Sequence, residues 1–116
     1  MAVLTVQTPT AVGSTLTYAA VAGGGDSFAA LSGARYLLLF RNTGGGGSVP
    51  TLDDPTSATP VGATTFNPDM AGTSVPATTG VTAMLIDANR FRDASGNVNM
   101  TYSASSGVTL AVVGPF

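Results

Sequence analysis

The stretch VNMTYSASSGVTLAVV, residues 98–113, decides the fold class. Apolar and polar residues alternate in its first half, and Ser105, Ser106 and Gly107 then precede a second run rich in Val. Alternation with a period of two is typical of a strand that has one buried face. Two such strands separated by a short turn predict a β-hairpin at the C-terminal end of the chain.

Similar short segments recur toward the N-terminus. Residues 14–18, STLTY, alternate in the same way, and residues 80–86, GVTAMLI, also favour a strand. Residues 35–41, RYLLLFR, contain a short apolar run between turn signals, which predicts a fully buried strand. Counting all such segments, we expect an all-β fold, a compact β-sandwich or barrel of about six to eight short antiparallel strands.

Two parts of the chain are expected to depart from this regular pattern. Residues 1–10 are predicted to form an N-terminal arm or edge strand, because Pro9 cannot donate to a sheet ladder, and residues 11–116 to form a single β domain. Residues 49–79 carry repeated prolines and predict a long irregular central loop, with short strands at 61–66 and near 73–75. Such a loop is often functional, so it is a candidate contact surface.

The composition indicates a protein whose function is binding rather than catalysis. Only 9% of the residues are charged, against roughly 25% in an average domain, and Lys, Glu, His, Cys and Trp are absent. Abundant Thr and Val favour strands. A weakly charged surface suits a protein whose surface is committed to neighbours, although Thr and Ser alone could also keep a monomer in solution.

Most catalytic and metal sites are excluded by the missing residue types. Without His or Cys, Ser-His-Asp and Cys-His arrangements, disulfides and thiolate metal sites cannot form. The adjacent residues Asp53 and Asp54 precede Pro55 in a predicted loop. This position favours a solvated turn rather than the paired catalytic carboxylates of a glycosidase. Residues 93–97, DASGN, lack the spacing and the Glu of a calcium loop. We therefore expect no enzyme activity, no cofactor and no metal.

Charge and hydropathy limit the compartment and the partners. A formal net charge of −2 argues against a nucleic-acid coat, because phosphate binding needs clustered Lys and Arg. Residues 1–10 show no signal-peptide pattern, and the longest wholly apolar run, residues 36–40, is far shorter than the roughly 20 residues of a membrane span. The sequence predicts a soluble protein made in the cytoplasm, with neither nucleic acid nor membrane as partner.

Six residues are candidate contacts to a partner or to another copy. Arg90 and Arg92 flank the aromatic Phe91 at a predicted corner, as residues of binding hot spots do. The alternative is that Phe91 fills the end of the core while both guanidinium groups point to water. The other candidates are Val3 and Leu4 in the N-terminal arm and Phe116 at the C-terminal end.

Three stretches resemble small proteins encoded among phage head genes. Residues 90–113, RFRDASGNVNMTYSASSGVTLAVV, are similar to the C-terminal hairpin of those proteins, which typically ends with "ND-A-x-G-x-V-x-V-T-Y-S" and then "x-V-T-V-A-V-L". Residues 34–49, ARYLLLFRNTGGGGSV, resemble their "LLLVRN" strand and Gly-rich turn, and residues 2–10, AVLTVQTPT, resemble their Thr-rich arm. Their "GPFP" motif is replaced here by residues 84–89, MLIDAN.

The resemblance implies a capsid decoration or cement protein of a tailed bacteriophage. Such a virion structural protein binds the major capsid protein on the outer surface of the head and stabilises capsomer contacts, often as a homo-oligomer, with a trimer favoured. Two other functions remain open from the sequence. One is a carbohydrate- or host-surface-binding module on a virion spike, against which the absence of Trp counts. The other is a tail-tube or head–tail connector subunit.

Overall fold

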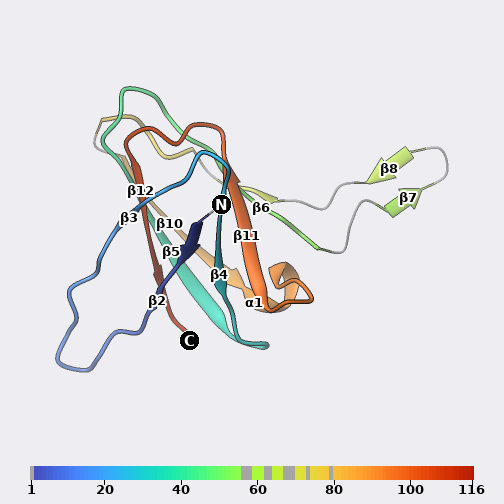
Figure 1. The fold of residues 1–116 in the computed structure, drawn as a ribbon, viewed down its shortest axis with the longest axis horizontal. Coiled ribbons are helices and arrows are strands. Elements are labelled where there is room, and N and C mark those ends of the chain that lie inside the picture. Colours follow the sequence, from blue (N-terminus) through green and yellow to red (C-terminus); the bar gives the residue numbers. More distant parts are fainter. Residues whose placement is uncertain (1, 56–58, 62–63, 67–69, 73, 79) are drawn as a thin grey trace.

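Short strands are the main regular elements of the computed structural model, which describes residues 2–55, 59–61, 64–66, 70–72, 74–78 and 80–116. The described strands are β1 (Ala2–Leu4), β2 (Val6–Gln7), β3 (Ala19–Ala20), β4 (Asp26–Ala29), β5 (Arg35–Asn42), β6 (Pro50–Leu52), β7 (Thr59–Val61), β8 (Thr64–Phe66), β9 (Met70–Ala71), β10 (Gly80–Asp87), β11 (Asn97–Tyr102) and β12 (Val108–Val113). The described helix is the single turn α1 (Ala88–Phe91) (Figure 1). The predicted all-β class is confirmed.

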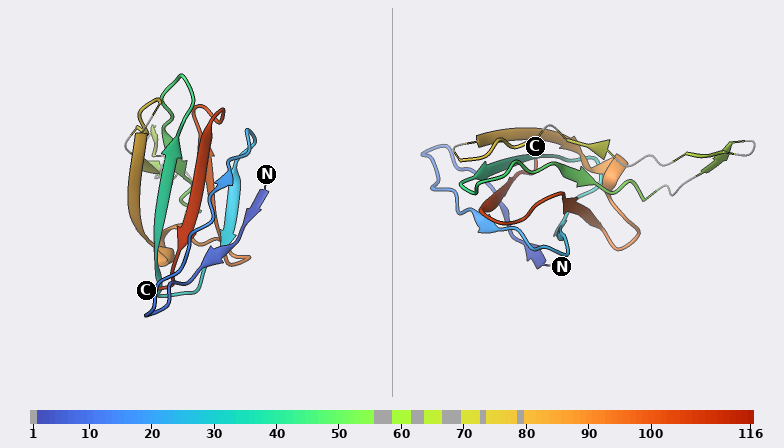
Figure 2. Two further views of the ribbon diagram at one scale, coloured as in Figure 1. Left: turned by 90° about the vertical axis from the view of Figure 1, so that its left-hand side faces the viewer. Right: turned by 90° about the horizontal axis from the view of Figure 1, so that it is seen from above.

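Two sheets form the body of the molecule (Figure 2). The sheet that we call the β11 sheet has the order β1-β4-β11-β6-β9, and the sheet that we call the β5 sheet has the order β10-β5-β12-β2, with β3 also paired to β12. Two pairs differ from the antiparallel expectation, because β1 runs parallel to β4 and β2 runs parallel to β12. The N-terminal segment, β1 followed by β2, therefore passes from the β11 sheet to the β5 sheet. Each sheet contains both parallel and antiparallel pairs.

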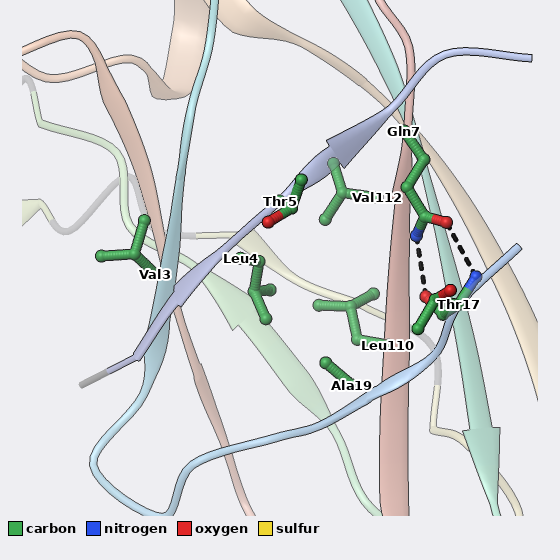
Figure 3. A pocket seen from close by; sticks show the side chains of 8 residues that line it. All are labelled: Val3, Leu4, Thr5, Gln7, Thr17, Ala19, Leu110 and Val112. Carbon is green, nitrogen blue, oxygen red and sulfur yellow. Dashed lines mark hydrogen bonds between the residues drawn. The ribbon is translucent and has the colours of Figure 1, made fainter.

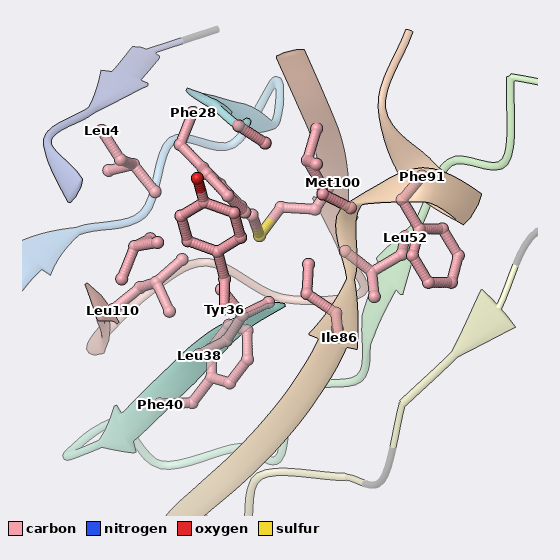
Figure 4. Close-up of a cluster of buried hydrophobic side chains, with 14 of the residues drawn as sticks. Leu4, Phe28, Tyr36, Leu38, Phe40, Leu52, Ile86, Phe91, Met100 and Leu110 are labelled. Carbon is pink, nitrogen blue, oxygen red and sulfur yellow. The ribbon is translucent and has the colours of Figure 1, made fainter. Parts of the chain in front are cut away.

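The core lies between the two sheets and is built by alternation along their strands (Figure 4). Tyr36, Leu38 and Phe40 of β5 are at most 1% exposed, and they meet residues such as Phe28 and Met100 of the β11 sheet. The rings of Phe28 and Tyr36 lie 5.3 Å apart between centroids. The expectation that the whole run 36–40 is buried is only half right, since the alternate residues 37 and 39 lie half-buried on the opposite face.

The predicted C-terminal hairpin is wrong, although both of its strands exist. β11 pairs with β4 and β6, whereas β12 pairs with β5, β2 and β3, so the two strands belong to different sheets. The connection through Gly107 carries the chain across the sandwich instead of folding it back in one plane. Apolar residues of the two strands, such as Met100 and Leu110, then point into the same core. Alternation predicts which face of a strand is buried, but not which strand is its neighbour.

The predicted long Pro-rich loop is not confirmed as a single irregular loop. Residues 50–52 and 70–71 form β6 and β9 at the end of the β11 sheet, and β7 and β8 pair with each other. The strand expected at 61–66 corresponds to β7 and β8, with residues 62–63 outside the described residues. Of the strand expected near 73–75, residue 73 is also outside them, while Val75 forms an isolated bridge with Ser48.

Candidate binding surface

The acidic side chains of the described residues are dispersed over the fold. Among these residues, no group of three or more His, Cys, Asp or Glu side chains is placed to hold a metal ion. The Asp53–Asp54 pair does not stand as two free carboxylates, because Asp54 is 7% exposed and its Oδ2 lies 3.3 Å from Nε of Arg90. Over the same part of the chain, no helix is long and apolar enough to cross a membrane.

One carboxylate is fully buried and serves the packing of β4 on β11. Oδ2 of Asp26 accepts hydrogen bonds from the hydroxyl of Tyr102 at 2.8 Å and from the backbone N–H of Ala22 at 3.1 Å. Burial, and then the hydrogen bond to Asp26, raises the pKa of Tyr102 far above its usual value. Tyr102 therefore stays protonated and remains a donor, and the pair ties the end of β11 to the start of β4.

The turn before β11 is held by a second aspartate. Oδ1 of Asp93 accepts from the backbone N–H groups of Ser95 and Asn97, and its Oδ2 accepts from the side-chain amide of Asn99, each at 2.9 Å. These donors, the N–H of Asn97 most of all, lower the pKa of Asp93 below its usual value of 3.8. The DASGN segment thus acts as a turn whose carboxylate oxygens are occupied by the turn's own donors.

The Arg90-Phe91-Arg92 cluster has its ring in the core and its charges on partners within the chain. Phe91 is 3% exposed, while Arg90 pairs with Asp54 and also stacks on Phe91, its Cζ lying 4.8 Å from the ring centroid. Arg92 donates from Nε to the carbonyl of Ala30 at 2.7 Å. The aromatic ring is thus not accessible to a partner in this conformation, although both guanidinium groups reach the surface.

The other predicted contact residues lie on different elements. Val3 on β1 is 78% exposed, and its neighbour Leu4 is 8% exposed and belongs to the core. Phe116 is 63% exposed, and its backbone exchanges two hydrogen bonds with Arg35 at the start of β5. Phe116 and the start of α1 lie at the same end of the β5 sheet, where Arg35 pairs with Asp87, whereas Val3 lies on β1 in the β11 sheet.

A cavity lies beside the N-terminal strand, where the chain passes from the β11 sheet to the β5 sheet (Figure 3). It has a volume of about 380 Å³ and is lined mainly by apolar side chains, among them Leu4, Leu110 and Val112. Gln7 closes one side by exchanging two hydrogen bonds of 2.7 Å with the backbone of Thr17. Its lining residues carry no ionisable group, so the cavity offers apolar contact and no acid–base chemistry.

The surface that the sequence reasoning missed is the outer face of the β5 sheet. Side chains that alternate with the core residues of β10, β5 and β12 all point outward there, and the register aligns them in rows across the three strands. We call this the outer apolar face, and its members are Leu37, Leu39, Val81, Ala83, Leu85, Ala111 and Val113. The β10 members are exposed, the β5 members are half-buried, and Ala111 and Val113 of β12 are buried, so the face is open mainly along β10 and β5. Val81 and Leu85 are 66% and 61% exposed.

The charged groups that the described residues place on this face lie at its two ends. Arg35 and Asp87 are cross-strand partners at one end, beside Phe116, and Arg41 stacks on Tyr18 at the other, with its Cζ 5.0 Å from the ring centroid. The signal for this face was present in the runs LLL of β5 and LAVV of β12, which lack a polar residue at every second position. Strands that are apolar on both sides are typical of sheets covered on both faces.

Comparisons with protein-family models, with curated proteins and with solved structures found no match for this chain.

Proposed function

We propose that this chain is a non-enzymatic virion structural protein, a decoration protein that binds the major capsid protein on the outside of a phage head. The observation that carries the proposal is the open part of the outer apolar face, where exposed Val81, Ala83 and Leu85 adjoin half-buried Leu37 and Leu39, with the charged groups of the described residues at its ends. Exposed apolar surface that is bounded by polar groups is typical of a protein–protein contact site.

The composition supports a role in assembly. With four Arg and six Asp as its only charged residues, the chain has little charge with which to repel copies or neighbours. The titratable groups described above are engaged in packing or in turns, so contact is the activity that the surface offers. A decoration protein needs no more than this, because it stabilises a shell by adding buried area at many identical sites.

The resemblance in residues 90–113 supports the same function. That segment forms α1, the Asp93 turn, β11 and β12, which together supply much of the core and the third strand of the outer apolar face. Similarity there would preserve the sandwich that positions the exposed residues of β10. The proposed partner is the major capsid protein, and the proposed location is the virion surface.

The test is binding of the purified protein to expanded, undecorated phage heads, measured by co-sedimentation and electron cryomicroscopy. We expect regular added density at capsomer junctions and heads that resist heating better. The variant Leu39→Asp places a charge in the middle of the outer apolar face and should abolish binding, whereas Thr101→Asp, at an exposed residue of β11 in the other sheet, should bind normally.

Circular dichroism would establish that both variants are folded. Binding to cell-wall glycans or to tail parts instead of heads would contradict the decoration function and favour a spike module or a tail subunit. Equal binding of the two variants to heads would contradict the role of the outer apolar face.

A further inference from the structure

Strand β10 forms the outer boundary of the β5 sheet and has a neighbour on one side only. It pairs with β5 over all eight residues from Gly80 to Asp87, and no other described strand pairs with it. In the left panel of Figure 2 it lies at the end of the row β10, β5, β12. An edge of this length presents a row of backbone donors and acceptors that can pair with another strand.

The register shows which backbone groups face this open side. Alternate residues of an antiparallel strand direct their N–H and C=O groups to opposite sides. The N–H of Ala88 donates to the carbonyl of Ala34, one step beyond the β10–β5 register, so the even-numbered residues of β10 face β5. The N–H of Thr43, an odd-numbered residue at the end of β5, donates instead to Gly107 on the side of β12, which fits the same alternation. The N–H and C=O groups of Val81, Ala83 and Leu85 therefore point away from the sheet.

The devices that usually protect an edge strand are absent from β10. Its sequence, GVTAMLID, contains no Lys and no Pro, its register with β5 runs without a bulge, and its charge is confined to Asp87 at the last position. The same three residues that present free backbone groups also place exposed apolar side chains on the outer face. Both features favour the addition of a strand at this edge.

We propose that β10 pairs antiparallel with β10 of a second copy of this chain, across a two-fold axis that passes beside Ala83. In this register Val81 of one copy stands opposite Leu85 of the other, Ala83 meets Ala83, and all three outward-pointing residues exchange backbone hydrogen bonds. The strand is thus complementary to itself about its own centre, as an isologous interface requires. The two β5 sheets become one continuous sheet, and the two outer apolar faces merge.

Charge placement favours a second copy as the occupant. No charge lies between Gly80 and Ile86, so this register opposes no like charges across the new boundary. The nearest charges on either side are Asp87 of one copy and Arg41 of the other, which are opposite in sign. A shift of the register by two residues would set Asp87 against Val81 and bury a carboxylate beside an apolar side chain, so pairing about Ala83 is preferred.

The first test uses the absence of cysteine from the chain. In a hydrogen-bonded antiparallel pair opposing Cα atoms lie about 5.5 Å apart, within the range that a disulfide spans. We expect Ala83→Cys to form a disulfide-linked dimer rapidly under mild oxidation. The control Thr101→Cys, whose residue is also exposed but lies on β11 in the other sheet, should remain mostly monomeric. Equal, slow cross-linking of both variants would overturn the proposal.

The second test needs no covalent bond and depends on the two-fold axis. In sedimentation experiments the wild-type protein should form dimers, and both Ala83→Lys and Ala83→Glu should weaken this association by at least about tenfold. An equimolar mixture of the two variants should restore the dimer, because only a two-fold axis brings residue 83 next to itself. A wild-type monomer, a trimer, or no restoration in the mixture would overturn the proposal.

The β10 pairing is independent of binding to the phage head. A dimer that fails to bind heads would leave the β10 pairing in place and contradict the proposed function. A monomer that binds heads would contradict the β10 pairing and leave the proposed function in place.

Discussion

The two edges of the β5 sheet differ in whether further strands of the chain pair with them. On one side, β2 pairs with Val112 and Val113 of β12, and β3 pairs with Thr109 and Leu110, so most of this edge is covered. On the other side, the eight residues of β10 have no described partner beyond β5. The chain thus uses its own N-terminal segment to close one edge and leaves the other available.

This difference separates the residues that stabilise the folded monomer from the residues that can bind a partner. The segment that closes the edge is itself anchored, because Leu4 at the end of β1 is buried and β1 pairs with β4 of the β11 sheet just before the chain continues into β2 on the β5 sheet. At the open side, Val81 and Leu85 are exposed and contribute little to the folded monomer. Substitutions at the closed edge should therefore change the free energy of unfolding, and substitutions at the open edge should change association.

The largest effect is expected at the closed edge. Leu4→Ala should lower the free energy of unfolding by about 2–3 kcal/mol, because it removes a buried side chain beside an existing cavity. Val3→Ala, the exposed neighbour, should change it by less than about 0.5 kcal/mol. Urea unfolding of dilute protein measures both values. Similar losses in the two variants would show that the N-terminal strand does not pack as described.

The next effect concerns the buried pair that aligns β4 with β11, next to β1. Tyr102→Phe should cost about 1–3 kcal/mol, because it removes the hydroxyl donor from a buried carboxylate. Oδ1 of Asp26 has no hydrogen-bond partner among the described residues, so the carboxylate would keep little beyond the N–H of Ala22. Thermal and urea unfolding measure the loss. An unchanged stability would mean that the hydroxyl is replaced by water at no cost.

A smaller effect is expected at the Asp93 turn, which belongs to neither edge. Asp93→Ala should cost about 1–2 kcal/mol through the loss of three accepted hydrogen bonds at a partly exposed site. Since the folded-state pKa lies below the usual 3.8, the ionised group stabilises the fold above that pH, and this contribution is lost as the pH falls through the folded pKa.

The pH dependence separates this turn from the two edges. Urea titrations between about pH 2 and pH 6 should show a smaller loss of stability on acidification in Asp93→Asn than in the wild type, because the asparagine does not titrate. Leu4→Ala should keep the pH dependence of the wild type. Identical pH profiles in all three proteins would contradict the lowered pKa.

The smallest effect on the monomer is expected at the open edge. Leu85→Ser should change the free energy of unfolding of dilute protein by less than about 0.5 kcal/mol, because the side chain is already 61% exposed. The same variant should lose self-association at high concentration. A large destabilisation of the dilute protein would show that Leu85 is buried in the monomer.

The all-β class could be predicted because alternation and turn residues act locally. The segments 98–102 and 108–113 are strands as expected, but their assignment to one hairpin is wrong, since pairing depends on where the connection at Gly107 leads the chain. The parallel pairs of β1 and β2 could not be predicted for the same reason. The central prolines suggested a loop, yet Pro50 lies in β6 beside Tyr102.

The contact surface was harder to predict than the fold. Reasoning from residue types selected Arg90, Phe91 and Arg92, whereas the fold buries Phe91 and engages both arginines within the chain. The outer apolar face is formed by residues from three strands that are distant in sequence. Its signal in the sequence is the lack of alternation in residues 37–39, a pattern that also predicts burial of both faces within a single chain.

The most direct measurement of the difference between the two edges is amide hydrogen exchange, followed by NMR at low and high protein concentration. The N–H groups of Thr82 and Met84, which bond to β5, should be protected at both concentrations. Those of Val81, Ala83 and Leu85 should exchange quickly in dilute protein and slowly at high concentration. If the exchange rates of these three N–H groups do not change with protein concentration, the proposal that β10 is an open edge that pairs with a second copy is contradicted.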